Sequence, residues 1–160
     1  MPMKRIIVHW TAGTHTPNGL DRTHYHRLID GEGRTVTGVD IAKNAAPIQP
    51  GYAAHTLNCN TDSIGVAICA AAGATENPLN FGKYPPTPVQ LTELIRVVAV
   101  LCQRYGIPCT RTTVLTHGEV QAHLGITQRG KWDLKRLPGI AGSGGDWLRA
   151  EVKARLDAGI

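Results

Sequence analysis

The sequence has no long apolar run, and no window approaches the roughly 18 consecutive apolar residues that a membrane span needs. The N-terminal stretch MPMKRIIVHW is apolar over too few residues for a signal peptide, and no small-residue cleavage site follows it. We therefore expect a protein that is made in the cytoplasm and has no stable membrane insertion. If it acts on the cell wall or in the periplasm, another agent must release it.

Cysteine is scarce, and none of the four cysteines forms a CxxC pair, which argues against a zinc ribbon. Cys69 and Cys102 lie within apolar runs, so we expect them to be small buried side chains rather than catalytic thiols. Internal repeats and low-complexity tracts are also absent from the 160 residues. Residues 1–160 are therefore expected to form a single domain.

Charged residues make up only 18% of the chain, but the basic ones are in excess, with a formal net charge of +5. Such a balance suits an anionic partner, for example a bacterial cell wall, a membrane surface or nucleic acid. The basic residues are not interleaved with aromatic residues, which are themselves few at 5%. We therefore do not expect nucleic acid to be the partner.

Hydrophobic patterning predicts an α/β domain, in which a central mixed β-sheet is flanked by helices. Residues 4–10 indicate a buried strand, whose alternation places Ile7, His9 and Thr11 on one face. Residues 63–70 are strongly apolar and indicate a central strand. The other predicted elements are a hairpin of residues 24–29 and 34–38 around Asp-Gly, a helix of residues 88–105 between Thr87 and Gly106, a strand of residues 112–116, and a last helix capped by Asp146.

Two histidines lie at the ends of predicted strands, where α/β folds place ligand sites. His9 lies at the end of the first predicted strand, and His117 directly follows the predicted strand of residues 112–116. Further along, Lys131 and Asp133 are two residues apart, so an extended chain projects both side chains to the same side. Two imidazoles and a carboxylate match the three protein ligands of a catalytic zinc ion. His9, His117 and Asp133 are therefore candidate zinc ligands.

The segments that carry these residues resemble, in the same order, those of type-2 N-acetylmuramoyl-L-alanine amidases, a family that shares its fold with the peptidoglycan recognition proteins. The matching segments are IIVHWTAG with His9, YHRLIDGEGRTVTG with Tyr25, AAHTLNCNTDSIGVAI with His55 and Asn58, LTHGEVQ with His117, and GKWDLKRLPG with Lys131 and Asp133. Together they span roughly residues 4–140.

The resemblance implies a zinc-dependent hydrolase that cleaves the amide bond between N-acetylmuramic acid and L-alanine in peptidoglycan or muropeptides. It implies Zn²⁺ as cofactor, with Tyr25 and Lys131 as catalytic residues. Lys131 is expected to stabilise the oxyanion, and Tyr25 to bind the water or the carbonyl and assist proton transfer. His55 and Asn58 are expected to contact substrate, as is Thr11 on the His9 side of the first strand.

The chain departs from the family pattern at three places. Some members carry a catalytic glutamate in a SIGxE pattern, and here that position is Ala67. The third ligand is Asp133, where other branches have cysteine, and the stretch between His9 and Tyr25 is short. Ala67 leaves the general base unidentified and favours a site that depends on Tyr25 and Lys131.

The other histidines and Glu119 are expected to lie outside the chemistry. His26 should face away from Tyr25, and His15, His24 and His123 are read as exposed. Glu119 is either a partner of a ligand histidine or, the preferred interpretation, an acid in the first turn of a helix.

Three functions remain open at this stage, all for a protein expected to be a monomer. The first is an endolysin of a phage or prophage, which the small size and the basic charge favour. The second is a cytoplasmic amidase that acts on recycled anhydro-muropeptides. The third is a non-catalytic peptidoglycan-binding module, which the presence of all three candidate ligands and Lys131 disfavours.

Overall fold

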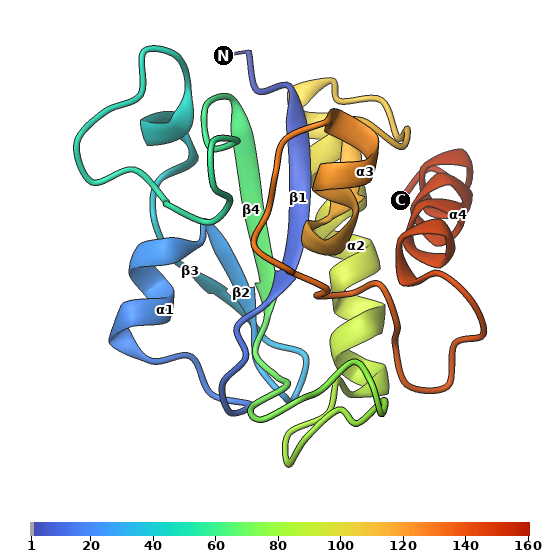
Figure 1. Cartoon of the computed structure of the whole chain (residues 1–160). Helices are drawn as coiled ribbons and strands as arrows, with labels where there is room; N and C mark the ends of the chain where they lie inside the picture. The colour runs from blue at the N-terminus through green and yellow to red at the C-terminus, as the bar shows by residue number, and fades with distance from the viewer. Residues whose placement is uncertain (1) are drawn as a thin grey trace.

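The computed structural model describes residues 2–160 and is built on one five-stranded sheet (Figure 1). The strands are β1 Arg5–Trp10, β2 Arg27–Ile29, β3 Thr35–Thr37, β4 Ser63–Ile68 and β5 Val114–Thr116. Their order across the sheet is β3-β2-β4-β1-β5. Only the β2–β3 pair is antiparallel, and the other three pairs are parallel. The predicted single α/β domain with a mixed sheet is confirmed, and β4 is its central strand.

The helices are α1 Gly19–His24, α2 Pro88–Tyr105, α3 Val120–Leu124 and α4 Gly144–Asp157, with short 3-10 turns η1 Ile41–Asn44 and η2 His117–Glu119. The long helix α2 begins and ends where the sequence predicts. The side chain of Thr87 accepts a hydrogen bond from the Gln90 backbone, and Gly106 ends the helix in a left-handed conformation. Within residues 2–160, no helix is long and apolar enough to cross a membrane.

The two faces of the sheet bury different clusters. Helices α2 and α4 pack together on one side of the sheet, where they enclose the main core (Figure 1). Ile6 and Val8 of β1 belong to this core, whereas Ile7 joins a smaller cluster with Leu115 and Val120. The predicted alternation of β1 is therefore confirmed. Because His9 has the parity of Ile7, it lies on the face opposite α2.

Several predicted boundaries are wrong. The run 24–29 is not extended throughout, because His24 ends α1, Tyr25 caps it and β2 begins only at Arg27. Asn18 and Asp21 form a capping box that starts this short helix, a signal that competes with strand propensity in the following residues. The strands predicted at 34–38 and 112–116 are shorter, at Thr35–Thr37 and Val114–Thr116.

The N-cap of α4 is Ser143 rather than Asp146. The Ser143 hydroxyl accepts a hydrogen bond from the Asp146 backbone N–H at 3.1 Å. Asp146 lies within the first turn, where its carboxylate still interacts favourably with the helix dipole. The sequence pattern places the start of α4 too late, because its first two residues, Gly144 and Gly145, are poor helix formers.

Candidate metal centre

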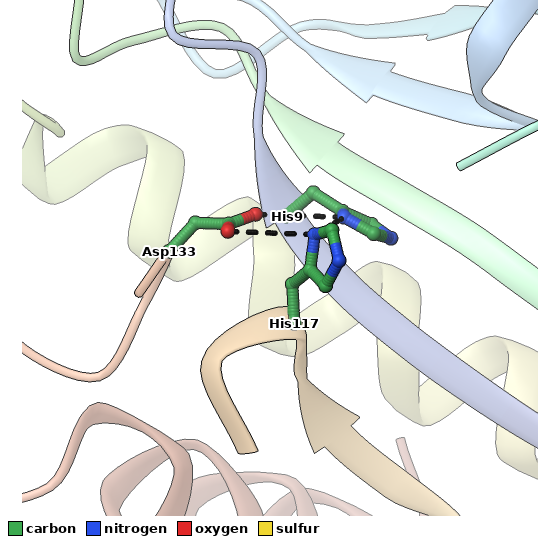
Figure 2. Close-up of side chains that lie close together, drawn as sticks. All are labelled: His9, His117 and Asp133. Atoms are coloured by element: carbon green, nitrogen blue, oxygen red, sulfur yellow. Dashed lines mark hydrogen bonds and ion pairs between the residues drawn. The ribbon is translucent and has the colours of Figure 1, made fainter. Parts of the chain in front are cut away.

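His9, His117 and Asp133 come together from three distant segments, and all three side chains are buried. His9 lies near the carboxyl end of β1, His117 opens η2 directly after β5, and Asp133 lies in the loop before α4. β1 and β5 are parallel neighbours, so their carboxyl ends meet at one edge of the sheet. Figure 2 shows the carboxylate of Asp133 facing both imidazole rings.

The spacing of the facing atoms fits a metal ion. The two Nδ1 atoms of His9 and His117 are 3.1 Å apart, and the Asp133 oxygens lie 3.5 Å from His9 Nδ1 and 3.4 Å from His117 Nδ1. Ligands held tetrahedrally around zinc at its usual bond lengths are separated by about 3.3 Å. Two nitrogens and one oxygen also form a donor set of catalytic zinc sites. Among residues 2–160, this is the one group of three such side chains that could hold a metal.

The charges of these side chains suit metal binding at neutral pH. Burial lowers the pKa of His9 to about 4, although the neighbouring Asp133 carboxylate opposes this effect. Burial alone would raise the pKa of Asp133, but its close contacts with the His117 and His9 rings outweigh this effect and hold that pKa below its usual range. His9 is therefore neutral and Asp133 ionised, which are the protonation states that metal ligands require.

The two residues predicted to be catalytic lie in the groove over this centre. The groove has a volume of about 1100 Å³, and both Tyr25 and Lys131 line it. The Tyr25 ring centroid is 5.2 Å from that of His9. Burial, followed by the charge of Asp133, raises the pKa of the Tyr25 phenol, so the hydroxyl keeps its proton. Lys131 is exposed, and its positive charge helps to lower the pKa of His9.

The three residues predicted to bind substrate also line the groove, with different contacts. Asn58 is exposed, in a left-handed backbone conformation with φ of 55°. The Thr11 hydroxyl accepts hydrogen bonds from the backbone of Gly13 at 3.2 Å and of Ala70 at 3.3 Å. His55 is buried, and its Nδ1 lies 3.1 Å from His9 Nε2. Binding of substrate by these residues stays a prediction.

Two contacts around the centre have no signal in the sequence, the one between His117 and Gln128 and the one between Glu119 and Arg149. Gln128 Oε1 lies 2.9 Å from His117 Nε2, although Gln128 occupies an irregular loop that carries no pattern. Glu119 accepts a hydrogen bond from the Thr116 backbone at 2.9 Å in the first turn of η2, as the preferred interpretation expects. It also forms a buried two-point ion pair with Arg149 of α4, and a sequence separation of 30 residues gives no local signal for such a pair.

The remaining histidines lie outside the centre. His26 is fully buried between Asn44, 2.9 Å from its Nε2, and the Gly65 backbone N–H, 2.9 Å from its Nδ1. His24 is exposed, as expected. His15 and His123 are half-buried rather than exposed, because each binds a backbone carbonyl across the fold: His15 that of Pro85, and His123 that of Arg111.

Ala67 pairs with His9 in the parallel β1–β4 register and is fully buried. The strand position where some amidases carry a glutamate is therefore next to a candidate ligand, and in this chain it holds only a methyl group. A carboxylate from β4 is absent from the site.

Comparison with known families decides the relationship. The family model described as N-acetylmuramoyl-L-alanine amidase matches residues 1–139. The chain belongs to this amidase family. A comparison with curated protein sequences gives no match.

Solved structures of amidases share the fold. The endolysin LysCS, an N-acetylmuramoyl-L-alanine amidase from Clostridium intestinale, is 21% identical with a TM-score of 0.55, over 98% of this chain and 85% of its own. The Ph2119 endolysin of a Thermus scotoductus bacteriophage is 16% identical with a TM-score of 0.54, over 95% and 86%. AmiD of E. coli, bound to an anhydro-N-acetylmuramic acid peptide, is 19% identical with a TM-score of 0.52, over 73% and 49%.

Proposed function

We propose that this amidase-family protein is a zinc-dependent N-acetylmuramoyl-L-alanine amidase that hydrolyses the amide bond between N-acetylmuramic acid and L-alanine. The observation that carries the proposal is the buried group of His9, His117 and Asp133. His117 and Asp133 line the groove together with Tyr25 and Lys131. When bound there, zinc supplies a Lewis acid that polarises a carbonyl and lowers the pKa of water.

The residues around the metal ligands have defined tasks in this reaction. Water adds to the amide carbonyl carbon, the carbon–nitrogen bond breaks, and the departing amino group of alanine takes up a proton. Lys131 places a positive charge beside the carbonyl oxygen as negative charge develops on it. Tyr25, whose phenol keeps its proton, donates a hydrogen bond to the carbonyl or to the leaving nitrogen.

The role that we favour is that of an endolysin acting on intact peptidoglycan. The open groove of about 1100 Å³ and the net charge of +5 support an extended anionic substrate. The fold is shared with two endolysins, LysCS and the Ph2119 bacteriophage enzyme, and it is also shared with AmiD, which was solved with an anhydro-N-acetylmuramic acid peptide. Activity on soluble muropeptides is therefore the second candidate.

The test combines metal analysis of the purified protein with mass spectrometry of digested sacculi. We expect one zinc ion per chain, loss of turbidity, and free stem peptides beside intact glycan strands. Release of products from small muropeptides alone would instead favour the second candidate. Binding to sacculi without any product would identify a non-catalytic module.

His117→Ala should lose zinc and lytic activity together, because it removes a ligand. His15→Ala is the matched control, since it deletes an imidazole that is bonded to Pro85 outside the centre, and it should keep both. If His117→Ala still lyses sacculi in the presence of a chelator, the zinc mechanism is wrong.

A further inference from the structure

Each candidate ligand histidine turns one ring nitrogen toward Asp133 and the other toward a polar partner behind it. The Nδ1 atoms face the carboxylate, whereas Nε2 of His117 lies 2.9 Å from Gln128 Oε1 and Nε2 of His9 lies 3.1 Å from His55 Nδ1. A neutral imidazole carries one hydrogen, and only the other nitrogen can bind a metal. The partners behind the rings therefore decide whether Nδ1 is available.

The hydrogen bonds that run from His117 through Gln128 to Leu57 have a defined direction. Nε2 of Gln128 lies 2.9 Å from the backbone carbonyl of Leu57, which can only accept a hydrogen bond. The amide nitrogen must therefore face Leu57, and Oε1 must face His117. Because Oε1 also only accepts, Nε2 of His117 carries the hydrogen and Nδ1 keeps its lone pair.

The direction of the hydrogen bonds that run from His9 through His55 to Ser63 follows in the same way. Nε2 of His55 lies 3.2 Å from the backbone carbonyl of Ser63, so it carries the hydrogen and Nδ1 of His55 is an acceptor. Nε2 of His9 then donates to this acceptor, which again leaves Nδ1 of His9 free. The Thr56 hydroxyl, 2.8 Å from His55 Nδ1 and 3.4 Å from His9 Nε2, is compatible with this direction because a hydroxyl both donates and accepts.

Gly65 of β4 leaves the space that the His55 ring occupies. An ideal Cβ on Gly65 would lie 2.5 Å from the His55 ring, so the ring packs directly against the glycine backbone. This close approach brings His55 within reach of both Ser63 and His9. A side chain at position 65 would displace the ring from one or both contacts.

We propose that Gln128 and His55 are positioning residues, each anchored on a backbone carbonyl, that hold His117 and His9 in the tautomer with Nδ1 directed at the metal. The inference rests on the zinc site of the proposed function. His55 then orients the candidate ligand His9 as well as lining the groove. Gln128 orients His117, a function that its sequence context does not indicate.

Isosteric variants test the Gln128 chain. Gln128→Met keeps the shape but removes the acceptor, so zinc affinity, measured by competition with a chromophoric chelator, should fall about 10- to 100-fold. Gln128→Glu keeps an acceptor for His117 but loses the hydrogen bond to the Leu57 carbonyl, so its zinc affinity should fall less than that of Gln128→Met. Gln103→Ala, at an exposed position of α2, is the control and should bind zinc normally.

A second pair of variants tests the His55 chain. The Oδ1 atom of His55→Asn takes the place of Nδ1 and can still accept from His9, although the contact with Ser63 is lost, so zinc affinity should fall less than in His55→Gln. His55→Gln places its polar atoms at the position of Nε2 and leaves His9 without that acceptor, so affinity should fall about 10- to 100-fold. With saturating Co²⁺ in place of zinc, the visible absorption of Gln128→Met and His55→Gln should also differ from that of the wild type.

The melting temperature of the metal-free protein separates positioning from simple structural support. Positioning predicts that the affinity follows the acceptor, with Glu at 128 and Asn at 55 binding better than Met and Gln. Equal zinc affinity and an unchanged cobalt spectrum in all four variants, with or without a lower melting temperature, would overturn the inference alone. A wild-type protein that binds no zinc would overturn the proposed function and this inference together.

Discussion

Lys131 and Arg129 are the two positively charged side chains that line the groove, and Lys131 is two residues from the candidate ligand Asp133. Lys131→Ala should leave zinc content unchanged, because the lysine is not a ligand. The rate at which this variant hydrolyses its substrate should fall about 100-fold, the usual effect of losing one group that stabilises an oxyanion. Zinc content and turnover of sacculi measure the two effects. Lys153→Ala, exposed on α4, controls for the loss of one positive charge. Parallel loss of zinc in Lys131→Ala would contradict the assignment.

Tyr25 contributes a hydroxyl whose raised pKa keeps it protonated. Tyr25→Phe retains the ring beside His9 and removes only the donor. Turnover should fall about 10²-fold or more, the range for a positioned proton donor, while zinc affinity stays the same. Steady-state kinetics with a defined muropeptide, alongside zinc titration, make the comparison. Unchanged turnover would show that the ring only packs against the centre.

Some residues of the site could be predicted from the sequence, and others could not. His9, His117 and Asp133 could be named from strand-end position, the Lys-x-Asp spacing and the family resemblance, and the structure brings them together. Gln128 could not, because a glutamine in an irregular loop has no periodicity and its partner His117 is identified only by the fold. For His55, the resemblance indicated the groove but not the contact with His9.

At the level of elements, α4 supports the segment that carries His117. Arg149 donates to both oxygens of Glu119 and to the carbonyl of Val114, which ties the helix to β5 and η2. Gly145 permits this contact, because a Cβ there would collide with the Glu119 carboxylate. The helix is therefore bonded to the residues on both sides of the candidate ligand His117.

Arg149→Ala should reduce the free energy of unfolding by about 3–5 kcal/mol, because it leaves the Glu119 carboxylate buried without its partner. Denaturant unfolding of the metal-free protein measures the change. Arg104→Ala, exposed on α2, should change stability by less than about 0.5 kcal/mol. A loss as small as that of the control would mean that Glu119 is satisfied by water or by Thr116 alone.

Elements with strong local signals were predicted with their ends, and those with competing signals were not. In α2, a threonine cap, a proline in the first turn and a terminal glycine all agree with the apolar stripe. In residues 18–29, the capping box of α1 competes with the β-forming residues that follow, so the boundary between helix and strand was misplaced.

At the scale of the whole molecule, stability should depend on pH through His26. Burial lowers its pKa from 6.5 to about 4, although the hydrogen bond with Asn44 opposes this effect. The unfolded chain therefore binds a proton between pH 6.5 and 4 that the folded state does not, so stability falls as the pH falls through this window. The loss amounts to at most about 3 kcal/mol.

Protonation would also remove the acceptor that His26 Nδ1 offers to the Gly65 backbone. Denaturant unfolding at several pH values, in the presence of a chelator, measures the slope. His26→Asn should be less stable at neutral pH but should show a flatter dependence between pH 6.5 and 4. His9 and His55, whose pKa values burial also lowers, add to the residual slope in the same direction. A variant with the wild-type slope would contradict the assignment to His26.

Taken by itself, the sequence determined the α/β class, the central strand, the long helix with both its ends, and the face of β1 that carries His9. These features follow from interactions between residues close together in the chain, which leave a periodic pattern. Only the tertiary structure decided that Gln128 and His55, each bonded to a backbone carbonyl, contact the two candidate ligand histidines. It also decided that Arg149 pairs with Glu119 of η2 and that Ala67 lies beside His9. These contacts join segments far apart in sequence, and their partners are chosen by packing rather than by any local preference.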